Sequence, residues 1–276
     1  MKRVCELIDM SQQHVMAIVN VTNDSFYDAS RCYDESSVAR RVEQAVSEGA
    51  TMLDIGGYSS RPGADDISPE EEWRRVKMGL KVARLVAPQV IVSIDTFRSD
   101  VAQRAVEEFG PIIINDITAG QVDKRILAVV AQYNLPYVAM HMRGTPQTMQ
   151  SCVDYPNGVV DEVYGYFEKR CDELRAKGVN NIILDVGFGF AKSVEQNYEL
   201  LAGLNRMTDF GCPLLVGVSR KSMIYKPLGV TPSEALTGTI ALHWEALRSG
   251  ANILRVHDVR EAVEVVKLYG EYCKAL

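Results

Sequence analysis

The sequence predicts a single α/β domain in which eight parallel strands alternate with helices. Three observations predict it: eight short apolar runs recur along the chain, helix-like patterns separate them, and polar or ionisable residues stand at the end of each run. The 276 residues, 47% of them hydrophobic, suit one closed barrel better than two average domains. We therefore expect one domain over residues 1–276 that folds as a (β/α)8 TIM barrel. Its first residues, about 1–14, are expected to form a short N-terminal extension.

The apolar runs are the expected strands. They are short and rich in β-branched residues, and successive residues are apolar, as in strands buried on both faces of a parallel sheet. In chain order they are residues 15–21, 52–55, 90–94, 112–114, 137–140, 182–184, 214–218 and 253–256. An open, doubly wound sheet would use the same alternation. Eight units, with no G-x-G-x-x-G after the first run, favour the closed barrel.

The segments between the runs carry helix signals. After the first run, Val38, Val42, Ala45 and Val46 recur at helical spacing, and Gly49 ends the pattern. Other helix starts show a capping residue followed three positions later by an acid or amide. These starts are SPEE (68–71), SVEQ (193–196), TPSE (231–234) and DVRE (258–261). A short helix is also expected over residues 222–225.

Composition narrows the class of protein. The net charge of -6 predicts no nucleic-acid partner, because no basic field covers the chain. Glu6 and Asp9 interrupt the only stretch that resembles a signal peptide, and no run is long enough to cross a membrane, so we expect no membrane association. The six cysteines form no C-x-x-C pair, which argues against a zinc site or redox dithiol. We expect a cytoplasmic protein with reduced thiols.

The polar residues at the strand ends predict an active site, because the C-terminal ends of barrel strands form the catalytic face. Asp95, Asn115 and Asp185 each follow an expected strand. Any one of them alone could cap a helix or begin a turn. Together, their donors and acceptors suit a flat heterocycle with N–H groups and ring nitrogens, such as a fused aminopyrimidinone.

Cationic residues form a second group. Arg61 follows the second strand, Lys221 the seventh, and Arg255 and His257 stand at the end of the eighth. A single surface arginine usually has no role, but TIM barrels often bind phosphate after strands seven and eight. Ser222, at the start of a short expected helix, adds a place for a carboxylate or phosphate.

Asn20, at the end of the first strand, has two interpretations. It either satisfies backbone groups in a turn or supplies an oxygen ligand to Mg²⁺, which needs few protein ligands. The sequence has no G-x-S-x-G motif, which argues against a serine nucleophile. A Schiff base at Lys221 stays open as an alternative.

At these residues the chain resembles the dihydropteroate synthase family, the pterin-binding TIM barrels of folate synthesis. The matching segments, in order, are NVTNDSFYD (20–28), DIGGYSSRPGA (54–64), SIDTFR (93–98), INDITAG (114–120), MHMRGTPQTMQ (140–150), LDVGFGFAK (184–192), VGVSRKSMI (216–224) and RVHDV (255–259). They cover every strand end, which makes the resemblance more specific than any single motif.

The resemblance implies a transferase that joins 6-hydroxymethyl-7,8-dihydropterin diphosphate to 4-aminobenzoate, giving 7,8-dihydropteroate and pyrophosphate. It implies Mg²⁺ as cofactor, a homodimer through outer helices, and sensitivity of the enzyme class to sulfonamides. Mg²⁺ and arginine and histidine cations would neutralise the leaving pyrophosphate, while aspartates stabilise positive charge on the pterin methylene.

The resemblance also assigns residues. The pterin ligands would be Asp95, Asn115, Ile117, Met140, Asp185, Gly217, Lys221 and Arg255. The diphosphate ligands would be Asn20, Arg61, Arg255 and His257, with Asn20 also at the metal. The 4-aminobenzoate site would be formed by Ser60, Pro62, Phe190, Lys221 and Ser222. Asp95, Asp185, Lys221, Arg255 and His257 are the expected catalytic residues.

Three positions depart from the family pattern, and three alternatives remain. Asn23 stands where proline is usual, Tyr58 where an acid is common, and Ser60 where threonine is usual. Because Ser60 is the smaller residue, we expect a slightly reshaped aminobenzoate pocket and an altered tolerance of sulfonamides. The alternatives are a methyltetrahydrofolate methyltransferase, a non-catalytic pterin-binding paralogue, and an unrelated phosphate-binding aldolase or isomerase barrel. The cationic group argues against the first two, since neither needs a diphosphate site.

Overall fold

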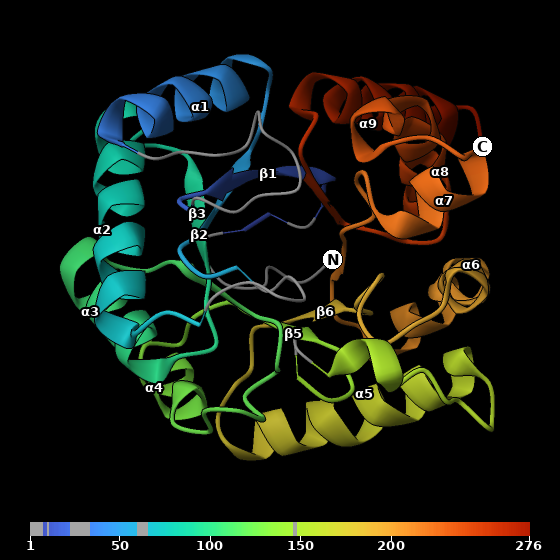
Figure 1. Ribbon diagram of the computed structural model, residues 1–276, viewed down its shortest axis with the longest axis horizontal. Coiled ribbons are helices and arrows are strands. Elements are labelled where there is room, and N and C mark those ends of the chain that lie inside the picture. Colours follow the sequence, from blue (N-terminus) through green and yellow to red (C-terminus); the bar gives the residue numbers. More distant parts are fainter. Residues whose placement is uncertain (1–7, 10, 23–33, 60–65, 146–147) are drawn as a thin grey trace.

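The computed structural model describes residues 8–9, 11–22, 34–59, 66–145 and 148–276. The predictions for Asn23, Ser60, Arg61 and Pro62 lie outside the described residues. Eight parallel strands form a closed barrel, with each strand paired to the next and the eighth paired to the first. Helices surround the strands as an outer ring (Figure 1). The predicted TIM barrel is confirmed.

The strand positions agree with the prediction to within about two residues, the usual uncertainty of an element boundary. The strands are β1 His14–Asn20, β2 Met52–Gly56, β3 Ile91–Asp95, β4 Ile113–Asp116, β5 Tyr137–Met140, β6 Ile182–Asp185, β7 Leu214–Val216 and β8 Ile253–Val256. The largest differences are at β4, which continues two residues further than predicted, and β7, which ends two residues earlier. Asp95, Asn115 and Asp185 therefore lie within their strands, where the ladder fixes their direction.

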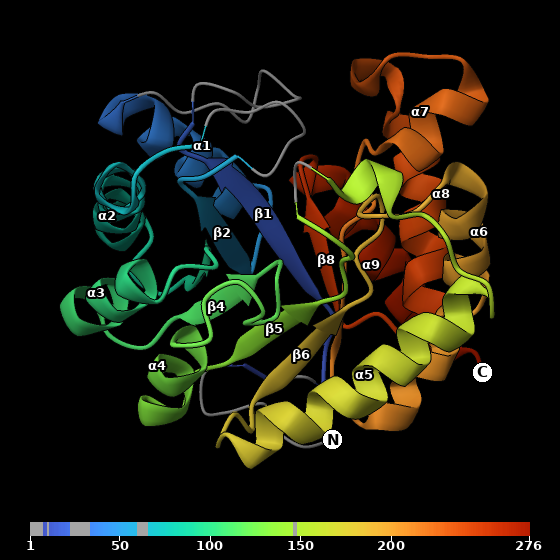
Figure 2. The same ribbon diagram turned by 60° about the horizontal axis from the view of Figure 1, so that its bottom comes forward.

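The helices follow the strands in the expected order. They are α1 Glu35–Ser47, α2 Pro69–Val86, α3 Ser99–Phe109, α4 Ile126–Gln132, α5 Val159–Ala176, α6 Val194–Ala202, α7 Ser222–Leu228, α8 Leu236–Arg248 and α9 Val259–Lys274. Short 3₁₀ segments are η2 Met149–Ser151, η3 Leu204–Phe210 and η4 Pro232–Glu234. Helix α7 confirms the short helix expected after the seventh strand and stands beside the upper part of α8 in Figure 2. In the described part of the chain, no helix has the length and apolar character needed to cross a membrane.

Most of the predicted helix signals are confirmed. The side chains of Ser68 and Ser193 cap α2 and α6, and Thr231 forms a capping box with η4. Two details were wrong. Val46 is 39% exposed and lies outside the buried stripe of α1. Asp258 makes no cap bond to α9, because its carboxylate accepts two hydrogen bonds from Arg220 instead.

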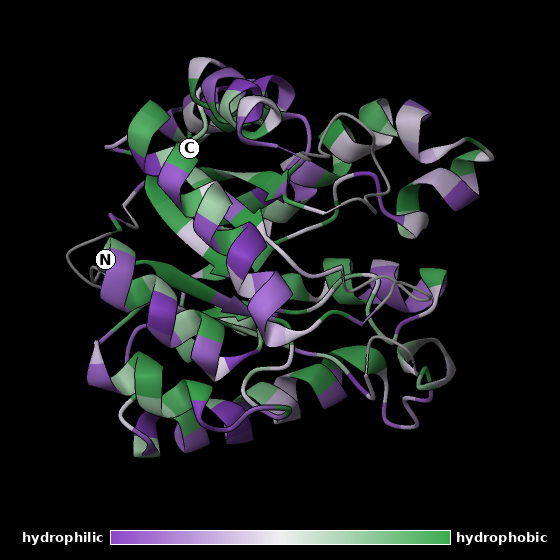
Figure 3. Cartoon of the chain, turned by 60° about the vertical axis from the view of Figure 1, so that its left-hand side comes forward, coloured by the Kyte–Doolittle hydropathy of each residue, from purple (hydrophilic) through white to green (hydrophobic). Residues whose placement is uncertain are grey.

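The inward-facing side chains of the barrel form layers. One apolar layer contains one residue from near the start of each strand, with Ile8 packed against it. These residues are Met16, Met52, Ile91, Ile113, Val138, Ile183, Leu215 and Ile253. Outward-facing residues pack on the helices, whose other faces are hydrophilic (Figure 3). Because side chains alternate along a strand, two residues past the apolar layer the interior receives Asp54, Asn115, Asp185 and Arg255. These polar residues therefore all face the interior of the barrel, next to the apolar layer.

The Arg220–Asp258 pair is the first testable feature. Both side chains are nearly buried, and the guanidinium nitrogens lie 2.8 Å from the two carboxylate oxygens. Asp258→Ala would leave a buried, uncompensated guanidinium, so we expect the free energy of unfolding to fall by about 3–5 kcal/mol. Urea denaturation measures it. Glu271→Ala is the matched control: its pair with Lys274 is 72% exposed on both sides, and its loss should cost less than about 1 kcal/mol. Equal losses for the two variants would contradict the assignment.

Candidate active site

The strand register places several predicted site residues in one row. Asn20 of β1 pairs with Gly56 of β2, Gly56 with Asp95 of β3, and Asp95 with Asn115 of β4. A Cβ atom at Gly56 would lie 3.4 Å from Asn20 Oδ1 and 3.7 Å from the Asp95 Cβ. The glycine therefore leaves a space between Asn20 and Asp95 that any other residue would fill.

Arg255 of β8 lies between two carboxylates. Its Nε donates to Asp54 Oδ2 at 2.6 Å, and its Nη2 donates to Asp95 Oδ2 at 2.9 Å. Asp54 is fully buried, and the same Oδ2 accepts a hydrogen bond from Asn115 Nδ2 at 3.0 Å. One aspartate thus orients two predicted pterin ligands. No local pattern in the sequence indicates which side chains Asp54 orients.

Two carboxyl groups of the site, those of Asp95 and Asp185, have raised pKa values. Burial raises the pKa of Asp95 to about 7; the Arg255 charge opposes this shift, and the Asp54 charge adds to it. Burial also raises the pKa of Asp185, against the effect of the nearby Lys221 ammonium. The backbone N–H of Gly187 donates to Asp185 Oδ1 at 2.8 Å. Both acids are therefore held in a region of low polarity where a neighbouring positive charge is strongly favoured.

Lys221 lies beside the segment that follows β6. Its Nζ donates to the Phe188 carbonyl at 2.6 Å and lies 5.0 Å from the centre of the Phe190 ring. Burial lowers the pKa of Lys221 to about 8, while the Asp185 charge raises it, so the amine is mainly protonated at neutral pH. A Cβ at Gly217 would lie 3.7 Å from Lys221 Nζ. The glycine leaves an open flank beside the ammonium.

An apolar cluster adjoins these charged groups. It contains the buried residues Ile117, Met140, Met142, Met149 and Ala191, with Phe97, Cys152 and Phe190 packed against it. The predicted pterin contacts Ile117 and Met140 and the predicted aminobenzoate wall Phe190 therefore belong to one surface. Cys152, for which the sequence suggested no role, lies at its edge.

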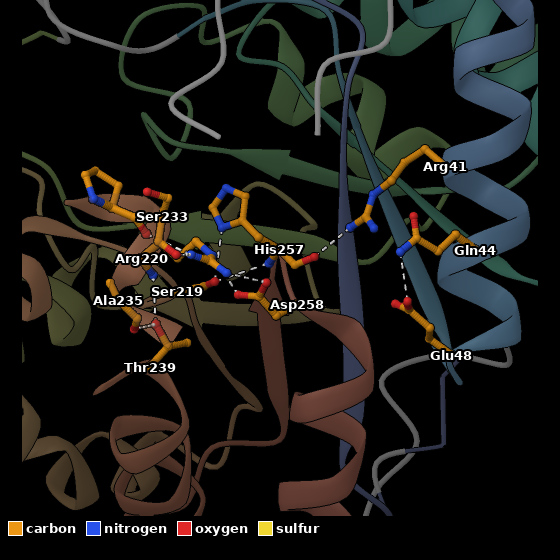
Figure 4. A network of polar contacts seen from close by, with 11 residues as sticks. Arg41, Gln44, Glu48, Ser219, Arg220, Ser233, Ala235, Thr239, His257 and Asp258 are labelled. Carbon is orange, nitrogen blue, oxygen red and sulfur yellow. Dashed lines mark hydrogen bonds and ion pairs between the residues drawn. The ribbon is translucent and has the colours of Figure 1, made fainter. Parts of the chain in front are cut away.

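His257 differs from its prediction. Its Nδ1 lies 3.0 Å from Ser219 Oγ, which also accepts from the His257 backbone N–H, and Arg41 Nη2 donates to the His257 carbonyl at 2.9 Å (Figure 4). Burial lowers the pKa of His257 to about 3. Neighbouring cations lower it further: Arg255, Arg41, Arg220 and Lys221. The histidine is therefore neutral in the free protein, and its expected role as a cation beside a bound diphosphate stays a prediction.

Other predicted residues lie as follows. Ser222 is the first residue of α7, directly after Lys221. Tyr58 lies under Arg98, whose guanidinium is 5.2 Å from the ring centre and donates to the buried Glu72 at 2.8 Å. The departure at Tyr58 thus gives Arg98 an aromatic partner.

Three residues near the site were not recognised as such in the sequence: Arg41, Lys192 and Glu72. Lys192 closes the 184–192 segment, so the motif itself is a signal that could have identified it. Arg41 and Glu72 sit in ordinary helical patterns. Their contacts are long-range, so no local signal marks them.

The fold and this site define a barrel enzyme that binds a pterin. The family described as pterin binding enzyme matches residues 16–257. The chain is 40% identical over 265 residues to dihydropteroate synthase of Escherichia coli (strain K12), covering 95% of this chain and 92% of that protein. The chain belongs to the dihydropteroate synthase family, whose members are transferases of folate synthesis.

Solved structures agree. The crystal structure of Yersinia pestis dihydropteroate synthase with a sulfonamide drug complex superimposes with a TM-score of 0.90 at 36% identity, covering 98% of this chain and 97% of that one. A structure of Xanthomonas albilineans dihydropteroate synthase with 4-aminobenzoic acid gives a TM-score of 0.85 at 36% identity, covering 97% and 95%. This relationship removes the alternative of an unrelated aldolase or isomerase barrel.

The neutral state of His257 predicts a pH effect on stability. The unfolded chain binds the proton below about pH 6.5, whereas the folded chain does so only near pH 3, so the folded state loses stability as the pH falls through that window. His257→Gln removes this contribution. Between pH 6.5 and 4.5 we expect the variant to lose about 2 kcal/mol less than the wild type in urea titrations. The opposite slope from Asp95 is common to both proteins. Identical pH dependence of the two would contradict the assignment.

Proposed function

We propose that this chain condenses 6-hydroxymethyl-7,8-dihydropterin diphosphate with 4-aminobenzoate, forming 7,8-dihydropteroate and pyrophosphate. The observation that carries the proposal is Arg255 held between Asp54 and Asp95, beside Asn115. This arrangement places a fixed cation next to hydrogen-bond acceptors and donors, above the apolar layer of the barrel. A flat heterocycle rich in N–H groups and ring nitrogens matches such a set.

The pterin slot follows from the hydrogen bonds already made. Asn115 gives an N–H to Asp54, so its Oδ1 is the atom left to accept from the pterin. Asp185 Oδ1 is taken by Gly187, which leaves Oδ2 for a second pterin N–H. Lys221 supplies a donor for a ring nitrogen or carbonyl, and Arg255 presents the face of its guanidinium. Ile117 and Met140 line the apolar side of the slot.

The diphosphate belongs near β8 and β1. Ser219 Oγ accepts from the His257 backbone, so we assign its hydroxyl hydrogen to Nδ1, which places the imidazole proton on Nε2. His257 then donates a neutral N–H to a phosphate oxygen, while Arg255 supplies charge. Arg61, predicted for this site, lies outside the described residues.

Mg²⁺ fits the residues at the end of β1. The Asn20 amide oxygen is a hard ligand of the kind Mg²⁺ prefers, and Gly56 keeps open a space that a Cβ would fill next to that oxygen. Asn20 would hold the ion, with water and diphosphate oxygens as its other ligands. When bound, the ion supplies further neutralisation of the diphosphate charge.

The chemistry then requires charge stabilisation rather than a strong base. As the C–O bond to the diphosphate breaks, the pterin methylene gains positive charge, which the buried carboxyls of Asp95 and Asp185 favour. The arylamine of 4-aminobenzoate has a free lone pair, forms the C–N bond and releases its proton afterwards. Phe190, Lys221 and Ser222 would receive its ring and carboxylate, with Ser60 and Pro62 predicted beside them; the contact of Lys221 with the Phe190 ring and the place of Ser222 at the start of α7 support this. The homodimer and cytoplasmic setting stay predictions.

An activity assay tests the function. The full chain is mixed with Mg²⁺, the dihydropterin diphosphate and 4-aminobenzoate, and pyrophosphate release is followed with and without the amine. We expect release to depend on the amine and dihydropteroate to appear in equal amount, because the amine is the attacking group. Release without the amine, or none at all, would defeat the proposal.

A binding measurement tests the slot. Asp185→Ala removes the acceptor proposed for a pterin N–H, so calorimetry should show pterin binding weakened by about 1–3 kcal/mol. Asp161→Ala is the control: this exposed helical carboxylate pairs with Arg206 on the surface, and its loss should leave binding unchanged. If Asp185→Ala binds as tightly as the control, the pterin lies elsewhere.

A further inference from the structure

Lys192 is a buried cation to which the proposed mechanism gives no role. Its residue is only 6% exposed, and its Nζ has three acceptors: His141 Nδ1 at 3.0 Å, the Gly187 carbonyl at 3.1 Å and the Phe190 carbonyl at 2.9 Å. None of the three is a carboxylate. Removing an ammonium from water is costly, and buried lysines are ordinarily paired with an acid. A position held at such a cost needs an explanation.

The two carbonyls that Lys192 binds are the ends of a turn, residues 187–190. Within this 187–190 turn, the Gly187 N–H donates to Asp185, and the Phe188 carbonyl accepts from Lys221. The Phe190 ring lies 5.0 Å from the Lys221 ammonium. These three groups of the turn therefore contact residues proposed to hold the pterin or the aminobenzoate.

The backbone around this turn includes three residues with positive φ. Gly187 and Gly189 have φ values of 70° and 80°, and Ala191, just past the turn, has a φ of 52°. A Cβ at Gly187 would collide with the His141 carbonyl. Glycine adopts the left-handed region readily, whereas alanine, which carries a Cβ, does so only at a cost. Ala191 therefore keeps this conformation only where surrounding groups hold it.

We propose that Lys192 is a positioning residue: by binding the Gly187 and Phe190 carbonyls, it holds the 187–190 turn in the shape that presents Asp185, Phe190 and Lys221 to the substrates together. This inference rests on the proposed function. Lys192 contacts neither the pterin methylene nor the arylamine nitrogen in this proposal; it acts through the 187–190 turn.

His141 lets this arrangement persist on both sides of neutral pH. Burial lowers the pKa of Lys192 to about 7; Asp185 raises it, and Lys221 and Arg143 lower it further. Burial also keeps His141 neutral, since its pKa lies well below the ordinary value. The ammonium gives three N–H groups to three acceptors. The neutral amine gives two and accepts one from His141 in its other tautomer. The turn keeps its contacts in either state.

The test compares Lys192→Met with wild type in the synthase assay, at pH 6 and pH 8, with the full chain and Mg²⁺. We expect the KM for 4-aminobenzoate to rise about tenfold and kcat/KM to fall about 10–100-fold, because misplaced binding groups cost orders of magnitude. The factor should be the same at both pH values. Tyr155→Phe is the control: it removes the hydrogen bond to the Ala191 carbonyl, in the same segment but outside the turn, and should change KM less than about twofold.

A double-mutant cycle separates positioning from simple support of the fold. If Lys192 acts through the turn, the effects of Lys192→Met and Phe190→Leu on KM are non-additive. Additive effects, or an unchanged KM with a lower melting temperature, overturn the proposal. If Lys192→Met does not fold by circular dichroism, Lys192→Gln, which keeps two donors, takes its place in the cycle. A wild type without amine-dependent pyrophosphate release sinks the proposed function itself; an active wild type with an unaffected variant sinks only the role of Lys192.

Discussion

The site depends on one partly buried ion network, in which Arg255 binds the fully buried Asp54 and the partly buried Asp95. The two carboxylates offset the hydration that the guanidinium loses. Its partners come from β2 and β3, while Arg255 itself comes from β8. These strands are brought within reach only when β8 pairs with β1 and closes the barrel. Closure of the sheet and assembly of the charge network are therefore the same event, and the orientation of Asn115 follows from it through Asp54.

The network also divides the mouth of the barrel by charge. Carboxyl groups gather on β2, β3 and β6, whereas Lys221, Arg255 and neutral His257 lie on the β7–β8 side. A substrate with a heterocycle at one end and a diphosphate at the other fits this division in one orientation. Burial lowers the pKa of His257, and the cations on its side of the mouth lower it further. Burial raises the pKa of Asp95 to about 7, against the opposing effect of the Arg255 charge. Both pKa shifts arise mainly because these groups are removed from water.

Much of this was visible in the sequence, for a physical reason. Strands, most of the predicted caps and the polar strand ends depend on residues a few positions apart, so alternation and capping patterns revealed them, and Asp95, Asn115 and Asp185 were found in this way. The misses depend on distant partners. Asp258 appeared to cap its own helix but pairs with Arg220, 38 residues away, and Arg255 meets Asp54 across 201 residues. The protonation state of His257 depends on four cations from three parts of the chain. No local pattern encodes such neighbours.

The alternation of side chains along the strands limits how such a site can evolve. Asp54, Asp95 and Asn115 face inward because each lies an even number of residues past the apolar layer of its own strand. Inserting one residue into β3 ahead of Asp95 would turn that carboxylate toward the helices and send Ile94 into the barrel. Insertions inside strands therefore disrupt the site, whereas insertions in the connecting loops do not change which strand residues face the barrel interior. In such a barrel we expect new substrate preferences to arise through changes in the lengths of the connecting loops, while the inward-facing strand residues stay the same.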